Sequence, residues 1–365
     1  MRRQDHLLTV SFASNYYYGG EEPNGEIYRV FFKNTEKMPH SMKRKILRGM
    51  EYIRGWSKII KIAQTEKFDV IHIHWLLMYK VDLRYVPVLK RYCKKMILTA
   101  HNVIPHIDGE KSVDDLRKLY SCFDTILLHG ETLKAEFGHY FPELSNKLRV
   151  QYHGEYFGQS TDCCPDNDHR VKELFEERKI YEKSFIIFGN HFYNKGTDRV
   201  VRIWLEDKRF DNTQLILVGR INKNYSELMS LVSDVEKREN IFLLDCFVED
   251  DLLNFLIKKA DAVVIPYRHA SMSGVLHTAA SFEKTVICTN TGAMGEYLED
   301  GVDSIVCENT DDSLLQGMII ANEMEKRKLA DMGKRFHESI RKNYSWGNIT
   351  KKLYEEVYCF NMEEL

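Results

Sequence analysis

Short apolar runs alternate with segments of helical periodicity along most of the chain. The run from Ala262 to Ile265 is typical of a strand in a parallel sheet that is covered on both faces. Comparable runs predict strands at 70–75, 96–100, 125–128, 148–152, 184–188, 214–218, 241–244, 261–265 and 285–289. Helical segments fill the intervals, and the alternation starts again at residue 184. This pattern predicts an α/β fold with two tandem, Rossmann-like, doubly wound parallel sheets.

The length of 365 residues also favours two domains, because one ordinary core does not grow that large. Residues 158–168 are polar and turn-rich without any period, so they are the candidate linker. We therefore expect one domain over 1–160, a second over 161–345 and a final helical segment over 346–365.

Residues 41–64 have the periodicity of an amphipathic helix. The predicted apolar stripe consists of Ile46, Met50, Ile53, Trp56 and Ile60. Lysine and arginine dominate the remaining surface of this helix. Two interpretations stay open, namely a helix packed on the sheet with a charged outer face and a helix that touches anionic lipid head groups.

The net charge of −2 hides an asymmetry between the two halves. Residues 1–160 carry 25 basic and 18 acidic side chains (+7), whereas residues 161–365 carry 27 and 36 (−9). The basic half reflects either ordinary surface variation or an anionic partner such as a membrane surface. No basic repeat supports nucleic acid as a partner.

Cysteine usage and hydropathy indicate the compartment. The eight cysteines are scattered without a C-x-x-C pair, as in reduced cytoplasmic proteins. We find no signal peptide and no apolar run near the roughly 20 residues that span a bilayer. A cytoplasmic protein is therefore expected, either soluble or peripheral at the inner face of the cell membrane.

Two turns at predicted strand ends carry candidate anion-binding groups. After the strand at 261–265, Tyr267 and the turn from Ser271 to Gly274 lead into a helix at Val275, whose first N–H groups point outward. Ordinary βαβ architecture with capping serines explains this turn equally well. The next strand, at 285–289, leads into a small-residue turn that contains Glu296.

The strand at 184–188 leads into a glycine-bounded loop that contains one lysine. This loop holds Gly189, Asn190, His191 and Lys195. A lysine at such a place can reach a phosphate across the crevice, although a Lys-Gly turn is usually only a helix start. Together with Arg220 at the next strand end and the turn at 271–274, the loop predicts an anion cradle on one sheet edge.

Six motifs in order resemble a known family. They are FDVIHIHW at 68–75, TAHNVIPH at 99–106, RVQYHGEY at 149–156, FG-x(5)-KG at 188–196, LVGR at 217–220 and AD-x(4)-PY…SGVL…TVI-x-T…G…E at 260–296. The chain resembles the nucleotide-sugar glycosyltransferases of the GT-B fold, most closely family 4, over roughly residues 65–358. The resemblance implies two domains facing a cleft, an acceptor-side domain first and a donor-binding domain second, with the final helix packing back on the first.

The resemblance also implies site roles. Lys195 would bind the donor diphosphate, the N–H groups of Ser273 and Gly274 its terminal phosphate, and His101 the transferred sugar. Further donor contacts are expected from Arg220, from Phe247 beside the base, and from Gly189, Asn190, Tyr267, Ser271, Met272 and Val275. Asn102 and His153 are placed on the acceptor side. The implied partners are a nucleotide-sugar donor and a lipid-linked or polysaccharide acceptor, and the implied reaction is a retaining transfer.

Two departures from the family pattern matter. The usual glutamate pair is replaced by residues such as Ser271 and Thr278, and the arginine before the Lys-Gly turn is absent. Glu296 and His191 are the candidate substitutes. No D-x-D motif is present, so we expect neither a metal nor a cofactor. A catalytically silent sugar-nucleotide-binding or scaffold protein and a GT-B-fold nucleotide-sugar epimerase stay open as alternatives.

Overall fold

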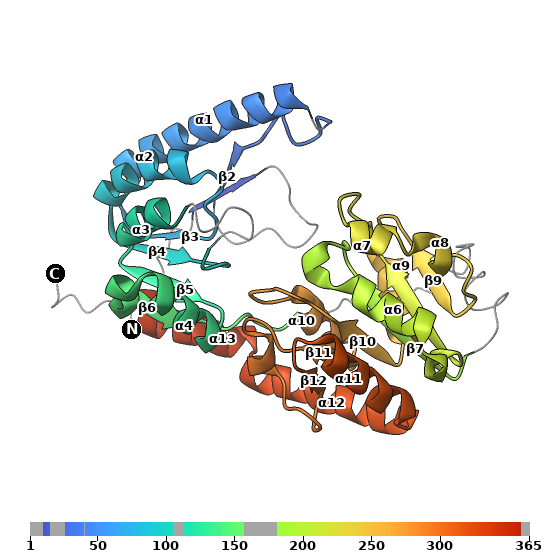
Figure 1. Cartoon of the computed structure of the whole chain (residues 1–365). Coiled ribbons are helices and arrows are strands. Elements are labelled where there is room, and N and C mark those ends of the chain that lie inside the picture. The colour runs from blue at the N-terminus through green and yellow to red at the C-terminus, as the bar shows by residue number, and fades with distance from the viewer. Residues whose placement is uncertain (1–9, 15–25, 40, 105–111, 157–180, 359–365) are drawn as a thin grey trace. The chain divides into compact units, whose positions relative to one another are not determined.

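The computed structural model describes residues 10–14, 26–39, 41–104, 112–156 and 181–358, in two compact units (Figure 1). The N-terminal unit comprises residues 1–127 and 137–149, and the C-terminal unit comprises residues 128–136 and 150–365. This grouping differs from a division at residue 160 because Glu296 hydrogen bonds to the segment at 131–132. The predicted linker lies outside the described residues, and the predicted return of the last helix to the first domain stays a prediction.

The N-terminal unit contains parallel strands, as predicted. One pair consists of β1 (Val10–Ser14) and β2 (Glu26–Phe31), and the latter had no clear pattern in the sequence. A four-stranded sheet has the order β3 (Phe68–Ile73), β4 (Cys93–Thr99), β5 (Thr125–Leu128) and β6 (Leu148–Val150). The connecting helices are α1 (Met42–Glu66), α2 (Tyr79–Leu89) and α3 (Val113–Ser121). Helix α4 (Glu131–Tyr140) begins in the C-terminal unit and ends in the N-terminal one.

The predicted helix at 41–64 is α1, but its apolar stripe does not face the core. Trp56 is buried, whereas Ile46, Met50 and Ile53 are 58%, 42% and 42% exposed. The buried face is rotated because Tyr52 and Trp56 both donate to the buried carboxylate of Asp82, at 2.7 and 3.1 Å. Satisfying that carboxylate fixes which side of α1 points inward.

The C-terminal unit contains a six-stranded parallel sheet with the order β12-β11-β10-β7-β8-β9. Its strands are β7 (Lys183–Phe188), β8 (Thr213–Val218), β9 (Ile241–Leu244), β10 (Ala262–Ile265), β11 (Thr285–Thr289) and β12 (Ile305–Cys307). From β7 the chain continues to β8 and β9 at one end of the sheet, and from β10 it continues to β11 and β12 at the other end. This reversal is the doubly wound pattern. The sequence analysis missed only the three-residue β12 among these strands.

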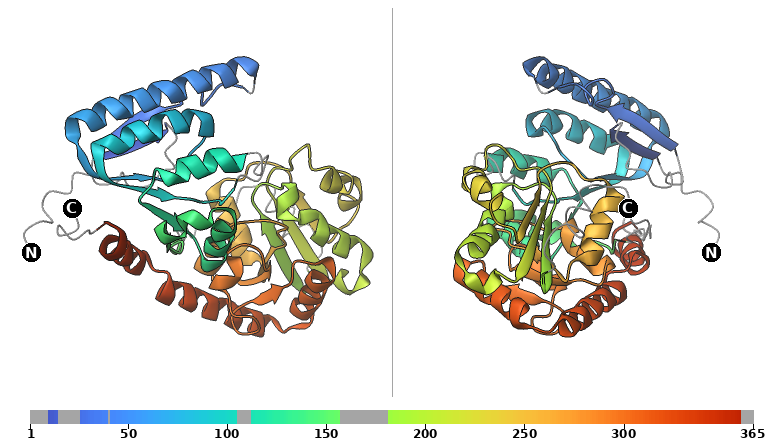
Figure 2. Two further views of the ribbon diagram at one scale, coloured as in Figure 1. Left: turned by 60° about the vertical axis from the view of Figure 1, so that its left-hand side comes forward. Right: turned by 90° about the vertical axis from the view of Figure 1, so that its right-hand side faces the viewer.

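Helices cover both faces of this sheet (Figure 2). They are α6 (Thr197–Glu206), α7 (Ser226–Met229), α8 (Val232–Val235), α9 (Asp250–Lys259), α10 (Gly274–Ser281), α11 (Asp311–Glu323) and α12 (Lys326–Asn343). Helix α13 (Trp346–Leu353) follows α12 in the chain and lies off the sheet. The helical segment expected between β8 and β9 consists of two short helices, α7 and α8, because the N–H of Leu231 bonds to the carbonyl of Leu228 and interrupts the regular ladder.

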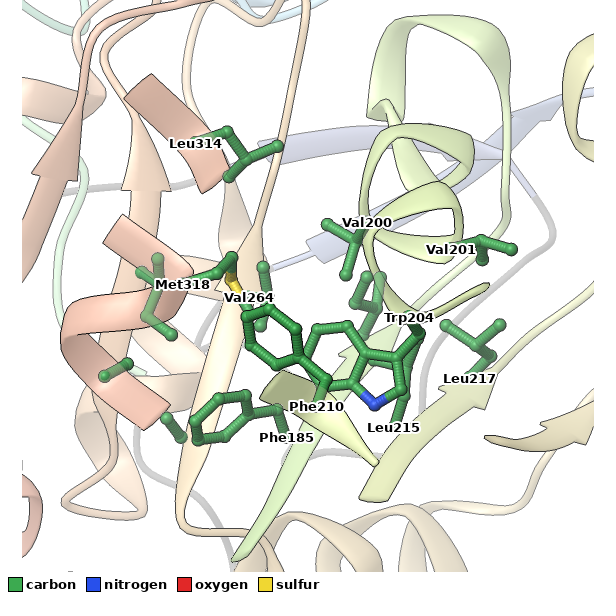
Figure 3. Packing of buried hydrophobic residues seen from close by; sticks show 14 of the residues in the cluster. Phe185, Val200, Val201, Trp204, Phe210, Leu215, Leu217, Val264, Leu314 and Met318 are labelled. Carbon is green, nitrogen blue, oxygen red and sulfur yellow. The ribbon is translucent and has the colours of Figure 1, made fainter. Parts of the chain in front are cut away.

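The core of this unit holds α6 firmly on the sheet. Trp204 of α6 is fully buried, and its ring lies 4.5 Å from that of Phe210 and 6.0 Å from that of Phe185 on β7 (Figure 3). Its indole N–H donates to the carbonyl of Thr213 at 3.0 Å. The loop that connects β7 to α6 is therefore anchored at both ends.

Candidate functional site

The strand order places two loops at one point of the C-terminal unit. β7 and β10 are hydrogen-bonded neighbours, and the chain leaves them toward opposite sides of the sheet. In doubly wound sheets, ligands bind beside the carboxyl ends of the strands at this reversal. The loops concerned are 189–196 after β7 and 266–273 after β10.

Two glycines allow these loops to approach closely. Gly196 has φ +66°, and a Cβ there would lie 2.0 Å from the carbonyl oxygen of Pro266. Gly219, after β8, has φ +130°, and a Cβ there would lie 2.1 Å from the carbonyl oxygen of Gly189. Only glycine adopts these conformations without strain and leaves room for the neighbouring backbone.

An ion pair also ties the two loops together. Arg268, after β10, forms a bidentate contact with Asp198 at the start of α6, with N–O distances of 2.7 and 2.8 Å. Burial alone would raise the pKa of Asp198, but hydrogen bonds from Arg268 and Tyr225 hold it below its usual range. The N–H of Arg268 donates to the carbonyl of Asn194. The loop that carries Lys195 is therefore fixed.

Lys195 belongs to the first loop, and its side chain reaches Tyr267 of the second. Its ammonium is 3.8 Å from the ring centroid of Tyr267, and the hydroxyl of Tyr267 accepts a hydrogen bond from Ser273 at 3.1 Å. Burial lowers the pKa of Lys195 to about 8. Among the described residues, no carboxylate forms an ion pair with Lys195. The structure thus brings together three of the residues predicted for the donor site, with a cation that has no counterion among the described residues.

The start of α10 lies beside this cation. Ser273 is the N-cap residue, but its side chain bonds to Tyr267 and does not cap the helix. The ring of Tyr156 covers Gly274, since a Cβ on this glycine would lie 3.0 Å from it. The N–H groups of the first turn and the ammonium of Lys195 together suit an anion.

Glu296 has a structural role that the sequence analysis did not foresee. Its carboxylate accepts the N–H groups of Glu131 at 2.8 Å and Thr132 at 2.7 Å, and the hydroxyl of Tyr152 at 2.9 Å. Burial alone would raise the pKa of Glu296, but these hydrogen bonds hold it below its usual range. The carboxylate caps α4, so the structure accounts for it without a sugar or ribose hydroxyl.

His191 is likewise unsuited to the role expected of it as a phosphate contact. The residue is only 1% exposed, and its Nδ1 lies 2.9 Å from the hydroxyl of Thr197. Burial lowers the pKa of His191 to about 4 although Asp245 opposes this shift. A neutral, enclosed imidazole orients the start of α6 and does not replace the missing arginine charge.

The other residues predicted for the donor site lie at the carboxyl ends of neighbouring strands. Gly189 and Asn190 follow β7 and are exposed, Arg220 follows β8 and is exposed, and Phe247 follows β9 with 67% exposure. Ser271, Met272 and Val275 are half-buried in the turn before α10 and in its first turn.

The residues predicted for the sugar and the acceptor fall in different units. His101 and Asn102 follow β4 in the N-terminal unit, where the ring of His101 stacks on Trp75 at 4.1 Å. In the same unit, the ring of His72 lies 2.7 Å from the hydroxyl of Thr99. His153 belongs to the C-terminal unit, and its N–H donates to the hydroxyl of Tyr297 at 2.9 Å.

The sequence analysis overlooked two side chains near α10. His277 is 1% exposed, its ring lies 5.1 Å from that of His153, and burial lowers its pKa to about 3. Tyr156 covers Gly274. His277 follows Ser273 by one helical turn, and this spacing was the available signal.

The described residues contain neither a candidate metal site nor a candidate membrane-spanning helix. No group of three or more His, Cys, Asp or Glu side chains in the described ranges is arranged to hold a metal ion. No helix within those ranges combines the length and apolarity needed to cross a membrane.

Residues 182–321 match the family model described as glycosyl transferases group 1. An uncharacterized glycosyltransferase of Methanocaldococcus jannaschii is 25% identical, over 98% of this chain and 90% of its own length. The N-acetyl-alpha-D-glucosaminyl L-malate synthase of Bacillus anthracis is 19% identical, over 83% and 77%. Anabaena HepE, solved in complex with UDP, has a TM-score of 0.65 at 14% identity, over 87% of this chain and 90% of that one. The predicted resemblance is thereby confirmed.

Proposed function

The chain is a glycosyltransferase of the GT-B fold, and from this premise we propose that it moves a sugar from a nucleotide diphosphate donor held at the carboxyl edge of the C-terminal sheet. One observation carries the proposal. Lys195 and the start of α10 meet where the strand order reverses between β7 and β10, joined through the ring of Tyr267. A diphosphate would supply the counterion that this ammonium does not have among the described residues.

The arrangement suits the breaking of a glycosyl–phosphate bond. As the bond between the anomeric carbon and the phosphate oxygen lengthens, negative charge grows on the departing diphosphate. The ammonium of Lys195 and the N–H groups at Ser273 and Gly274 stabilise that charge with fixed positive groups. The acceptor hydroxyl then bonds to the anomeric carbon and gives its proton to the leaving phosphate oxygen. In this scheme the transfer retains the anomeric configuration and proceeds without a metal.

Base and sugar contacts complete the proposed site. The exposed ring of Phe247, after β9, is suited to stack on the nucleobase, and Arg220, after β8, lies on the side of the diphosphate. The structure of HepE with UDP supports UDP as the first nucleotide to test. Within the N-terminal unit, stacking on Trp75 fixes the ring plane of His101, and its contact with the transferred sugar stays a prediction.

For the acceptor, we propose a lipid-linked or polysaccharide chain at the inner face of the cell membrane. The support is the charge of +7 over residues 1–160, which suits an anionic surface. The absence of the family's glutamate pair favours a second candidate, a protein that binds the sugar nucleotide without turning it over.

Donor binding and donor hydrolysis test the proposal and separate the two candidates. Calorimetric titration with UDP-sugars and GDP-sugars is followed by measurement of free nucleotide release. We expect both binding and slow hydrolysis, and both should weaken strongly in Lys195→Ala. Lys208→Ala is the matched control, because Lys208 is exposed and lies before β8 at the opposite edge of the sheet. Binding without release in the wild type would favour the silent protein, and no binding would refute both.

A further inference from the structure

Helix α1 of the N-terminal unit presents a row of large apolar side chains to solvent. Met42, Ile46, Met50 and Ile53 are 71%, 58%, 42% and 42% exposed. Their spacing of four, four and three residues places them along one side of the helix. Large apolar side chains gathered in this way mark an interaction surface and are unusual on an unoccupied one.

The exposed row cannot be buried by rotating α1, because the opposite side of the helix already packs in the core. Tyr52, Trp56 and Ala63 are buried, and the first two hold the carboxylate of Asp82. The ring of Trp56 also stacks on that of Tyr85 with centroids 6.2 Å apart. Rotating the helix to bury the row would expose these aromatic rings and remove two of the donors to a buried carboxylate.

The charges around the row have one sign. Residues 42–66 contain seven basic side chains and two acidic ones, a net charge of +5. Lys43, Arg54, Lys58 and Lys61 are exposed on the flank of the row. The carboxylate of Glu51 is engaged by Asn34 and Thr35, with contacts of 2.8 and 2.6 Å. The exposed face is therefore a strongly positive border around an apolar strip.

A basic pocket opens at the first turns of the same helix. It measures about 260 Å³ and is lined by Ser41, Arg44, Lys45 and Arg48. The side chain of Arg44 is held by the carbonyl of Thr35 at 3.0 Å, and Arg48 lies 3.8 Å above the ring of Phe32. Held guanidinium groups lose little freedom on binding a phosphate, so the pocket suits one.

We propose that this face of α1, defined by Met42, Ile46, Met50, Ile53 and the basic residues beside them, docks on an anionic lipid bilayer. The apolar row enters the boundary between head groups and acyl chains, and the pocket takes a lipid phosphate. Charge complementarity selects this occupant, because two copies of so basic a face repel each other. Docking would bring the proposed enzyme to a lipid-linked acceptor in the membrane. Only this link to the acceptor rests on the proposed function.

Vesicle cosedimentation of the full chain, without donor, tests the docking surface. The vesicles are pure phosphatidylcholine or phosphatidylcholine with phosphatidylglycerol, each at low and high salt. We expect partitioning onto the anionic vesicles that weakens at high salt. Lys43→Gln/Arg54→Gln/Lys61→Gln should lower the partition coefficient by about 100-fold. Ile46→Ser/Met50→Ser should lower it by about tenfold and leave weaker, fully salt-sensitive binding.

The matched control is Arg327→Gln/Lys328→Gln/Lys334→Gln, which removes the same charge from exposed positions of α12 and should partition like the wild type. Circular dichroism checks that each variant is folded. We expect all of them to fold, because every substituted side chain is exposed. Three results would each overturn the docking surface. The α1 and α12 variants could bind the vesicles equally, or the wild type could bind anionic and neutral vesicles equally. The protein could also form a dimer that Ile46→Ser/Met50→Ser abolishes. Normal UDP binding alongside such a result would leave the proposed function intact.

Discussion

Lys195 and Glu296 lie in two turns at the same edge of the C-terminal sheet, but the groups around their charges differ. The loop after β7 holds an ammonium whose pKa burial lowers to about 8, beside an aromatic ring and without a carboxylate partner among the described residues. The turn after β11 holds a carboxylate that accepts three hydrogen bonds, and these keep its pKa low. Both residues were predicted from the sequence as donor contacts.

The contrast separates a binding group from a structural one. A half-buried charge that the protein leaves uncompensated weakens the fold and gains its partner only from a ligand. A charge that is fully hydrogen-bonded stabilises the fold and has little left for a ligand. Lys195 should therefore matter for activity and Glu296 for stability.

The largest effect is expected from Lys195→Ala. Removing the cation that faces the leaving diphosphate should lower kcat/KM by about 100- to 1000-fold, in line with the loss of one fixed donor at a developing charge. The free energy of unfolding should stay the same or rise slightly, since the variant loses a half-buried charge that has no carboxylate partner among the described residues. Steady-state kinetics and denaturant titration measure the two quantities. Unchanged kinetics would refute the assignment.

Glu296→Ala should show the reverse behaviour. The N–H groups of Glu131 and Thr132 lose their acceptor, so the C-terminal unit should lose about 2–3 kcal/mol of stability in urea titration. Because the pKa of Glu296 is lowered in the folded state, its contribution is fully present above the ordinary glutamate pKa of 4.5 and is lost as the pH falls below that value, through the lowered folded-state pKa. Glu338→Ala on the exposed side of α12 is the control. A kcat loss larger than that of Lys195→Ala would reverse the comparison.

The pH dependence of UDP binding sharpens the assignment of Lys195. In the free protein Lys195 loses its proton near pH 8, whereas a bound diphosphate holds the proton in place. Binding above pH 8 then requires proton uptake, so the affinity should fall about tenfold per pH unit. Calorimetry at pH 7, 8 and 9 measures the slope. The decline should vanish in Lys195→Ala, and its persistence there would assign it to another group.

The smallest effect is expected from Ser273→Ala. The hydroxyl of Ser273 bonds to Tyr267 and positions the ring beneath Lys195, while the N–H groups of α10 remain in place. Losing one such neutral hydrogen bond should raise the Kd for UDP about fivefold. Thr278→Val, one turn further along α10, should leave the Kd unchanged. A large loss in Ser273→Ala would indicate direct contact of the hydroxyl with the diphosphate.

Sequence reasoning found most of the strands and the loop that carries Lys195, because hydrophobic runs and glycine-bounded turns are local signals. It failed at Glu296, His191 and the stripe of α1, because each depends on partners distant in sequence. Glu296 meets residues 131, 132 and 152, and α1 is rotated by Asp82. The bidentate pair of Arg268 and Asp198 was missed for the same reason.

The structure of the protein with bound UDP tests the central claim most directly. We predict a phosphate oxygen within about 3.2 Å of the ammonium of Lys195, at the start of α10 and above the ends of β7 and β10. A diphosphate bound elsewhere, with Lys195 still alone over Tyr267, would contradict the account.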